Sequence, residues 1–182
     1  MPLLNTIATP YAEALLQVAE SRQETDTVAD QVRGLLQVWS ESTELREAMT
    51  SPVLEPDAKK AALLALFQDQ ITPSLQNLLK LLADRQRLPV MDAVLLRFLE
   101  LYRDLRRITL ATVRSATPLS PEQQEQLNQR VKAIAGTEVV ELDVQVDPAL
   151  IGGFIVRMGS QVIDASLSGQ VRRLGLALAK VS

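Results

Sequence analysis

The residue types that most often carry out chemistry are scarce in this sequence. The 182-residue chain contains no cysteine and no histidine, which excludes thiol nucleophiles, imidazole bases, disulfides and zinc sites built from these ligands. Asp, Glu, Lys and Ser remain as candidates for acid–base or nucleophilic catalysis. Many carboxylates lie off the apolar stripes of predicted helices, which is typical of a solvated surface: Glu13, Glu20, Asp30 and Glu100.

Two motifs in the C-terminal third of the chain could serve a more specific purpose. Asp164 falls where a predicted hairpin ends and the last helix begins, so we expect its carboxylate to bond backbone N–H groups there rather than to act in catalysis. Ile151-Gly152-Gly153 lacks the Lys-Ser/Thr and the following helix of a phosphate-binding P-loop. We expect these glycines to permit a sharp turn or a close backbone approach.

Composition limits the remaining function classes. Hydrophobic residues make up 47% of the chain and aromatic residues only 3%, so the core must be built mainly from aliphatic side chains. The net charge of -3 argues against nucleic-acid binding, which needs a basic surface. No apolar run approaches the ~18 residues of a membrane span. The sequence therefore predicts no direct membrane insertion and gives no reason to expect a cofactor or a metal.

The first part of the chain, residues 1–106, has the apolar spacing of helices. Thr9-Pro10 and Thr72-Pro73 each combine an N-cap residue with proline at the first helical position, and they predict the starts of the first and fifth helices. Short connections separate the predicted helices, and each has one apolar stripe. We expect a six-helix bundle.

Over residues 107–182 the spacing of apolar residues changes, and it predicts an α/β lobe in which strands and helices alternate. From Ile108 onward, residues 108, 110 and 112 alternate with residues 109, 111 and 113, and β-branched residues become frequent, which predicts a strand. Further signals follow in chain order: a capping box at Ser120, a helix stop at Gly136, a strand over Val139–Val146, a hairpin loop at Gly159-Ser160 and a last helix from near Ser166. The predicted fold class is therefore mainly α, with a small α/β lobe that contains a β-hairpin and a C-terminal helix.

Several short motifs occur in the order found in one known family. They are Pro10-Tyr11-Ala12, Ala14-Leu15, Gln76-Asn77-Leu78-Leu79, Arg87-Leu88, Asp147-Pro148, Leu150-Ile151-Gly152-Gly153, Ile155, Gly159, Val162-Ile163-Asp164, Ser166 and Leu174. Each motif is weak by itself, but together they span nearly the whole chain. In this respect the sequence resembles the delta subunit of F-type ATP synthases, which in mitochondria is called the oligomycin-sensitivity-conferral protein.

The resemblance implies a non-catalytic stator subunit of a proton-translocating ATP synthase. Such a subunit belongs to the stalk that links the catalytic head to the membrane sector and resists rotor torque during ATP synthesis. In the family, the N-terminal bundle holds N-terminal helices of alpha subunits in a groove between its first and fifth helices. The matching positions here are Tyr11, Ala14, Leu15, Leu78, Leu81 and Leu82. The alternative for these side chains is that they fill the core of the bundle.

The resemblance also implies that the C-terminal lobe contacts the b-type subunits of the peripheral stalk. The motif positions that either face the stalk or support the lobe are Ile151, Gly152, Gly153, Gly159, Asp164 and Ser166. The chain has no basic residue before Arg22, so we expect no transit sequence. The expected location is the cytoplasmic or stromal face of a bacterial plasma membrane or a thylakoid membrane, through the ATP synthase complex.

Two other interpretations remain at this point. A helical adaptor of another assembly would share the bundle, but it has no need of the glycine hairpin or of the Asp164/Ser166 junction. An enzyme that uses only carboxylates or lysine would need polar residues that converge on the apolar stripes, and the sequence shows none.

Overall fold

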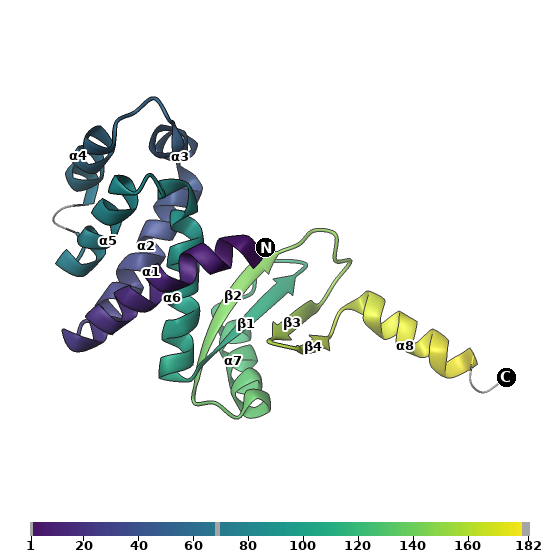
Figure 1. The fold of residues 1–182 in the computed structure, drawn as a ribbon. Helices are drawn as coiled ribbons and strands as arrows, with labels where there is room; N and C mark the ends of the chain where they lie inside the picture. The colour runs from purple at the N-terminus through teal and green to yellow at the C-terminus, as the bar shows by residue number, and fades with distance from the viewer. Residues whose placement is uncertain (1, 68–69, 180–182) are drawn as a thin grey trace. The chain divides into compact units, whose positions relative to one another are not determined.

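The computed structural model describes the backbone of residues 2–67 and 70–179, with side chains for residues 6–67 and 70–173. The helices of the described residues are α1 Pro2–Ser21, α2 Thr25–Glu41, α3 Thr43–Thr50, α4 Pro56–Phe67, α5 Pro73–Asp84, the 3-10 turn η1 Leu88–Val90, α6 Met91–Arg106, α7 Pro121–Ala135 and α8 Leu167–Ala179 (Figure 1). The strands are β1 Ile108–Ser115, β2 Val139–Val146, β3 Phe154–Met158 and β4 Gln161–Asp164. The fold class is mainly α with a small sheet, as predicted.

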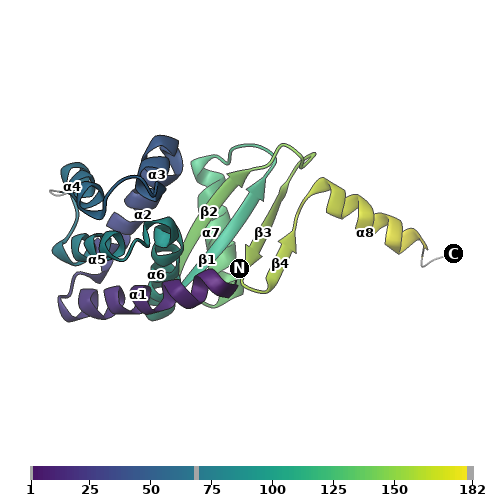
Figure 2. The same cartoon turned by 45° about the horizontal axis from the view of Figure 1, so that its top comes forward.

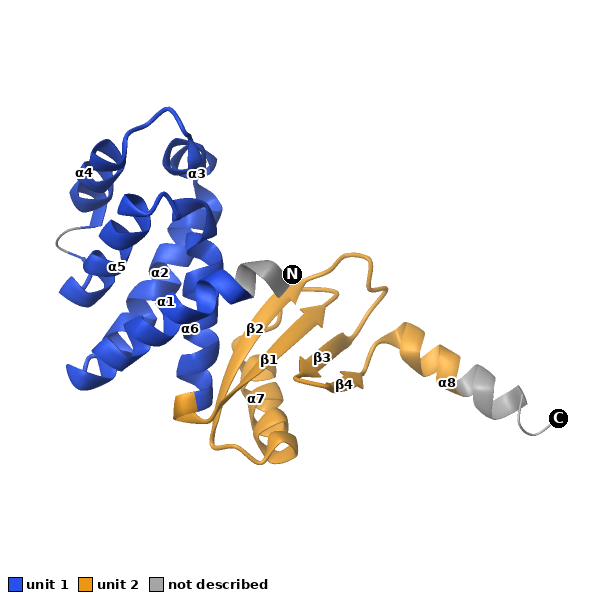
Figure 3. Ribbon diagram, in the orientation of Figure 1, with its two compact units in different colours: residues 1–104 blue, residues 105–182 orange. Residues whose placement is uncertain are grey.

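The chain divides into two compact units, residues 1–104 and 105–182 (Figure 3). Unit 1 has a core made mainly of aliphatic side chains, as the low aromatic content requires, and Phe98 is its largest fully buried side chain. Its largest fully buried side chains are Val28, Val32, Leu75, Leu82, Leu88, Met91, Val94, Leu95 and Phe98. Burial of each such side chain contributes roughly 1.5–3 kcal/mol, so this interior is the main source of stability in the bundle.

Polar contacts tie the helices of unit 1 together. The Tyr102 hydroxyl on α6 donates a hydrogen bond to Asp26 Oδ1 on α2 at 2.9 Å, and the Arg33 guanidinium lies 5.6 Å from the centre of the same ring. The Thr72 backbone N–H, just before α5, donates to Gln31 Oε1 on α2 at 2.8 Å. These bonds fix α5 and α6 against α2.

The first helix begins earlier than predicted. The sequence pattern placed the start at Thr9-Pro10, but α1 begins at Pro2 and contains Pro10 in its interior. A proline inside a helix removes one backbone hydrogen bond and typically costs ~3 kcal/mol. Ala8, Ala12 and other small residues of α1 are fully buried on one face, and this tertiary burial offsets the loss. The signal at Thr72-Pro73 is confirmed in position, because α5 begins at Pro73, but the Thr72 side chain makes no capping hydrogen bond.

Unit 2 is a four-stranded sheet in the order β2-β1-β3-β4, with α7 packed on one face (Figure 2). β1 and β2 are parallel, in the register Ile108↔Val139 to Ser115↔Val146, and α7 forms the crossover between them. β1 pairs antiparallel with β3, which pairs antiparallel with β4. The small core between sheet and helix consists of Ala111, Val113, Leu127, Val131, Val156 and Met158.

The local signals in unit 2 are confirmed. Ser120 forms a full capping box with Gln123, and Gly136 ends α7 in the left-handed region at φ 66°. Met158 pairs with Gln161, which leaves Gly159 and Ser160 as a two-residue loop, with Gly159 at φ 54°. The side chain of Leu174, part of the C-terminal motif, lies outside the described residues.

Candidate functional site

A groove runs along unit 1 between α1 and α5. Its volume is about 290 Å³. Its walls are Tyr11, Ala14, Leu15 and Val18 from α1, Arg22 just after α1, and Ser74, Asn77, Leu78 and Leu81 from α5. In each helix the first four of these positions are spaced i, i+3, i+4 and i+7, which is one face of a helix. Each helix therefore turns one continuous stripe toward the groove, and most of that surface is apolar.

The side chains of the groove differ in depth. Leu15 and Leu78 are only 4% and 7% exposed and form its floor, while Leu81 is 42% exposed and forms a wall. Ala14 is also exposed and is small, so it leaves the middle of the groove open. Leu82, which the family resemblance also assigned to the groove, is 0% exposed and lies in the core, so it does not line this surface.

Each end of the groove carries a cation. Arg87 donates from Nη1 to the Tyr11 hydroxyl at 3.2 Å, and its guanidinium lies 5.7 Å from the centre of the Tyr11 ring. Ser74, at the start of α5, bonds to Glu24 just after α1, so the two helices run antiparallel. Arg22 therefore lies at the opposite end from Arg87. The sequence suggested no role for Arg87 in the groove, because its partner Tyr11 is 76 positions away.

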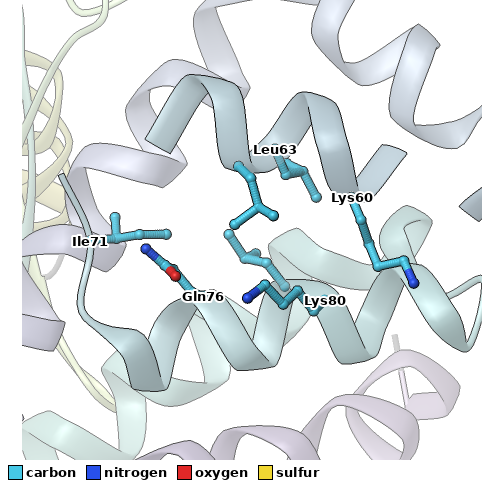
Figure 4. A pocket seen from close by; sticks show the side chains of 7 residues that line it. Lys60, Leu63, Ile71, Gln76 and Lys80 are labelled. Atoms are coloured by element: carbon cyan, nitrogen blue, oxygen red, sulfur yellow. The ribbon is translucent and has the colours of Figure 1, made fainter. Parts of the chain in front are cut away.

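A second concavity, between α4 and α5, is lined by the side chains shown in Figure 4 and is too small to hold a ligand. It is lined in part by Lys60, Leu63, Ile71, Gln76 and Lys80, and it has room for about 10 Å³ of solvent. This is about the space of one water molecule. The groove between α1 and α5 is thus the better candidate of the two for a binding surface in unit 1.

The glycine motif and Asp164 lie at the junction of β4 and α8. Asp164 Oδ1 accepts hydrogen bonds from the Ser166 backbone N–H at 2.9 Å and from the Ser166 hydroxyl at 2.5 Å. The expectation that this carboxylate bonds a backbone N–H group is confirmed. Gly153 has φ 84°, a left-handed conformation that favours glycine. Ile151 is 86% exposed, whereas Gly159 lies apart, in the hairpin loop.

A sequence model of the ATP synthase delta (OSCP) subunit matches residues 7–178 of this chain. The chain belongs to this family. Among curated relatives, the ATP synthase subunit delta of Synechococcus sp. (strain CC9311) is 66% identical over 182 residues, which is 100% of both chains. The organellar chromatophore subunit delta of Paulinella chromatophora is 67% identical over 181 residues, again covering 100% of both.

A solved structure gives the same result at the level of the fold. The chain is similar to a chain in the Toxoplasma gondii mitochondrial ATP synthase hexamer, with a TM-score of 0.73 and 25% sequence identity. The match covers 93% of this chain and 96% of that one. As a member of the delta (OSCP) family, the chain is part of the F-type ATP synthase assembly, in the peripheral stalk of its stator.

Within the delta (OSCP) family this subunit is structural and not catalytic, and its ionisable groups suit that role. Two hydrogen bonds from Ser166 lower the pKa of Asp164, and the bond from the hydroxyl has a larger effect than the bond from the backbone N–H. A general base needs a pKa nearer neutrality. Hydrogen bonds to Asp57 and Asp84 raise the pKa of Lys60 to about 12, so its amine stays protonated and is a poor nucleophile.

The described residues show neither a cluster of metal ligands nor a membrane-spanning helix. They contain no group of three or more Asp or Glu side chains that could hold a metal ion. None of their helices combines the length and the apolar character needed to cross a membrane.

Proposed function

We propose that the groove between α1 and α5 binds the N-terminal helix of an alpha subunit of the catalytic head. The observation that carries the proposal is the pair of matching helical stripes that line this groove. It lies between the two helices that the family resemblance names, and Tyr11, Ala14, Leu15, Leu78 and Leu81 are among its lining residues. An amphipathic helix fits such a surface when its apolar face enters the groove at i, i+3 and i+4 positions.

The charges at the groove ends specify the partner further. Arg22 and Arg87 lie at opposite ends, and Arg87 already contacts the Tyr11 ring. A helix with an apolar face and acidic residues toward both of its ends would complement this arrangement, because opposite charges speed association and fix register. The apolar floor supplies most of the affinity, since buried apolar anchors dominate such interfaces.

In the same proposal, unit 2 contacts the b-type subunits of the peripheral stalk, so that the chain links head and stalk and resists rotor torque. The exposed Ile151 and the start of α8 support this assignment, because they offer apolar surface. The chain would then lie on the cytoplasmic or stromal face of the membrane, held there by the complex. The relatives from a cyanobacterium and from an organellar chromatophore support a thylakoid location.

Calorimetric titration of the full chain with a synthetic peptide of the alpha N-terminal helix tests the groove. We expect saturable 1:1 binding. Tyr11→Ala removes a wall and Ala14→Asp places a carboxylate in an apolar groove, so each should weaken binding by roughly tenfold or more. The matched control is Ala61→Asp, which adds the same charge at an exposed position of α4 and should leave the affinity unchanged. Unaltered binding by both groove variants would rule out this site.

A further inference from the structure

A compact group of residues joins the end of β4 to the start of α8, and we call it the α8 clasp: Gly152, Gly153, Asp164, Ser166 and Gly169. Its hydrogen bonds form a chain. Asp164 Oδ1 accepts from the Ser166 N–H and hydroxyl, and Ser166 Oγ accepts from the Gly169 backbone N–H at 3.0 Å. Ser166 is 1% exposed, so it is a buried N-cap, which stabilises the first turn of α8.

The glycines of the clasp lie so close to their neighbours that a Cβ atom on any of them would require a neighbouring atom to move. A Cβ atom on Gly169 would lie 2.4 Å from Asp164 Oδ2. A Cβ on Gly153 would lie 2.4 Å from the carbonyl oxygen of Ala165, and one on Gly152 would lie 2.7 Å from Leu167 Cδ1. These separations are far below van der Waals contact. At Gly153 the loop therefore packs against the backbone that follows β4, whereas Gly152 and Gly169 lie against the side chains of Leu167 and Asp164.

Two further bonds connect α8 to its surroundings. The Leu167 N–H donates to the Gly152 carbonyl at 3.0 Å, which ties the first residue of the helix to the glycine loop. Arg173, one turn beyond Gly169, donates from Nη1 to the Asp164 carbonyl at 3.0 Å. The start of α8 is thus held from the loop, from the strand end and from its own second turn.

We propose that the α8 clasp fixes the direction in which α8 leaves the sheet, so that the start of this helix is a rigid extension of unit 2. A helix joined only by a flexible linker would sample many directions, and a partner would have to order it on binding. The clasp instead holds Leu167 and Val171, which are both exposed and one turn apart, in a fixed position. The inference concerns the free chain and does not depend on which partner binds.

Spin-label distance measurements on the full chain test the clasp. The sequence has no cysteine, so cysteines introduced at the exposed positions Ala133 on α7 and Gln170 on α8 are the only labelling sites. We expect a single narrow distance distribution in the parent. Asp164→Ala and Gly169→Ala should broaden it, because the first removes the acceptor and the second displaces the carboxylate.

Gly34→Ala is the matched control for Gly169→Ala. Both glycines lie inside helices, but a Cβ on Gly34 meets nothing within 4 Å. Alanine is the better helix former, so without the clasp both substitutions would stabilise their helices. We expect amide exchange at Leu167 and at position 169 to rise about fivefold or more in Gly169→Ala, as for a lost cap. Gly34→Ala should leave both amides unchanged.

Protection of the β1 and β3 amides shows whether unit 2 remains folded in each variant. Should Asp164→Ala or Gly169→Ala unfold it, Asp164→Asn is the second test, because it keeps the shape and one acceptor oxygen but removes the charge. We then expect a smaller but measurable rise in exchange at Leu167 and Gly169. A distance distribution and exchange rates equal to those of the parent, in variants that stay folded, would overturn the proposal.

Discussion

Two residues of this chain act through the small size of their side chains. Ala14 leaves the middle of the α1–α5 groove open between larger neighbours, and Gly169 leaves room for the Asp164 carboxylate against α8. Asp164 combines this close packing with charge, because it accepts two hydrogen bonds from Ser166. Hydrogen bonds to an ionised group are stronger than those to a neutral one, so the protonation state of Asp164 should affect the junction.

The acid stability of unit 2 should depend on Asp164. Hydrogen bonds from the hydroxyl of Ser166, the larger effect, and from its backbone N–H lower the pKa of Asp164 in the folded state from the ordinary value of 3.8. The carboxylate therefore stabilises the fold fully above about pH 4, and this contribution disappears as the pH falls through the folded pKa. We expect Asp164→Asn to be less stable than the parent near neutrality, with a difference that shrinks as the pH falls below the ordinary pKa of an aspartate.

Urea unfolding of the parent and of Asp164→Asn across this pH range, monitored by amide exchange in unit 2, measures the free energy of unfolding of that unit. Glu138→Gln, at an exposed position of the same unit, controls for the change in net charge. A stability difference between the parent and Asp164→Asn that does not vary with pH would contradict the assigned role.

At the scale of elements, the helices of unit 1 follow their apolar stripes more closely than their start signals. α1 continues through Pro10 because Ala8, Ala12, Leu15 and Ala19 are all buried on the same face. Local propensity is a weak determinant, and tertiary burial overrides it here. Where the signal and the packing agree, as in the capping box of α7, the element begins where the sequence predicts.

Replacement of Pro10 by alanine should therefore stabilise unit 1. The side chain is exposed, so little packing is lost, and the substitution restores a backbone donor inside α1. We expect the free energy of unfolding to rise by about 1–3 kcal/mol, measured by urea denaturation. Glu13→Ala, at another exposed position of α1, should change it by less than about 0.5 kcal/mol. A decrease for Pro10→Ala would mean that the proline is required for the course of α1.

At the scale of the whole molecule, the chain has two units with separate interiors. Unit 1 is built on helix stripes and unit 2 on a sheet covered by one helix. A stator subunit must hold two neighbours at once, and two independently packed units offer a surface for each. The proposed contacts follow this division, with the alpha-subunit helix on unit 1 and the stalk subunits on unit 2.

Core substitutions should affect the two units separately. Phe98→Ala removes the largest fully buried side chain of unit 1 and should destabilise that unit by about 3–5 kcal/mol. Hydrogen exchange should then accelerate in α2 and α6 but not in β1. Val113→Ala, in the core of unit 2, should give the reverse pattern. Equal acceleration throughout the chain in either variant would show that the two units unfold as one.

The sequence by itself determined the fold class, the order of elements and the family, because periodicity, caps and short motifs are encoded in neighbouring residues. It did not determine which of two adjacent leucines, Leu81 or Leu82, lines the groove. Nor did it reveal that Arg87 closes over Tyr11 or that Gly169 accommodates Asp164. Tertiary structure decided these features, since each depends on how separate segments pack against one another, and no local pattern records the outcome of that packing.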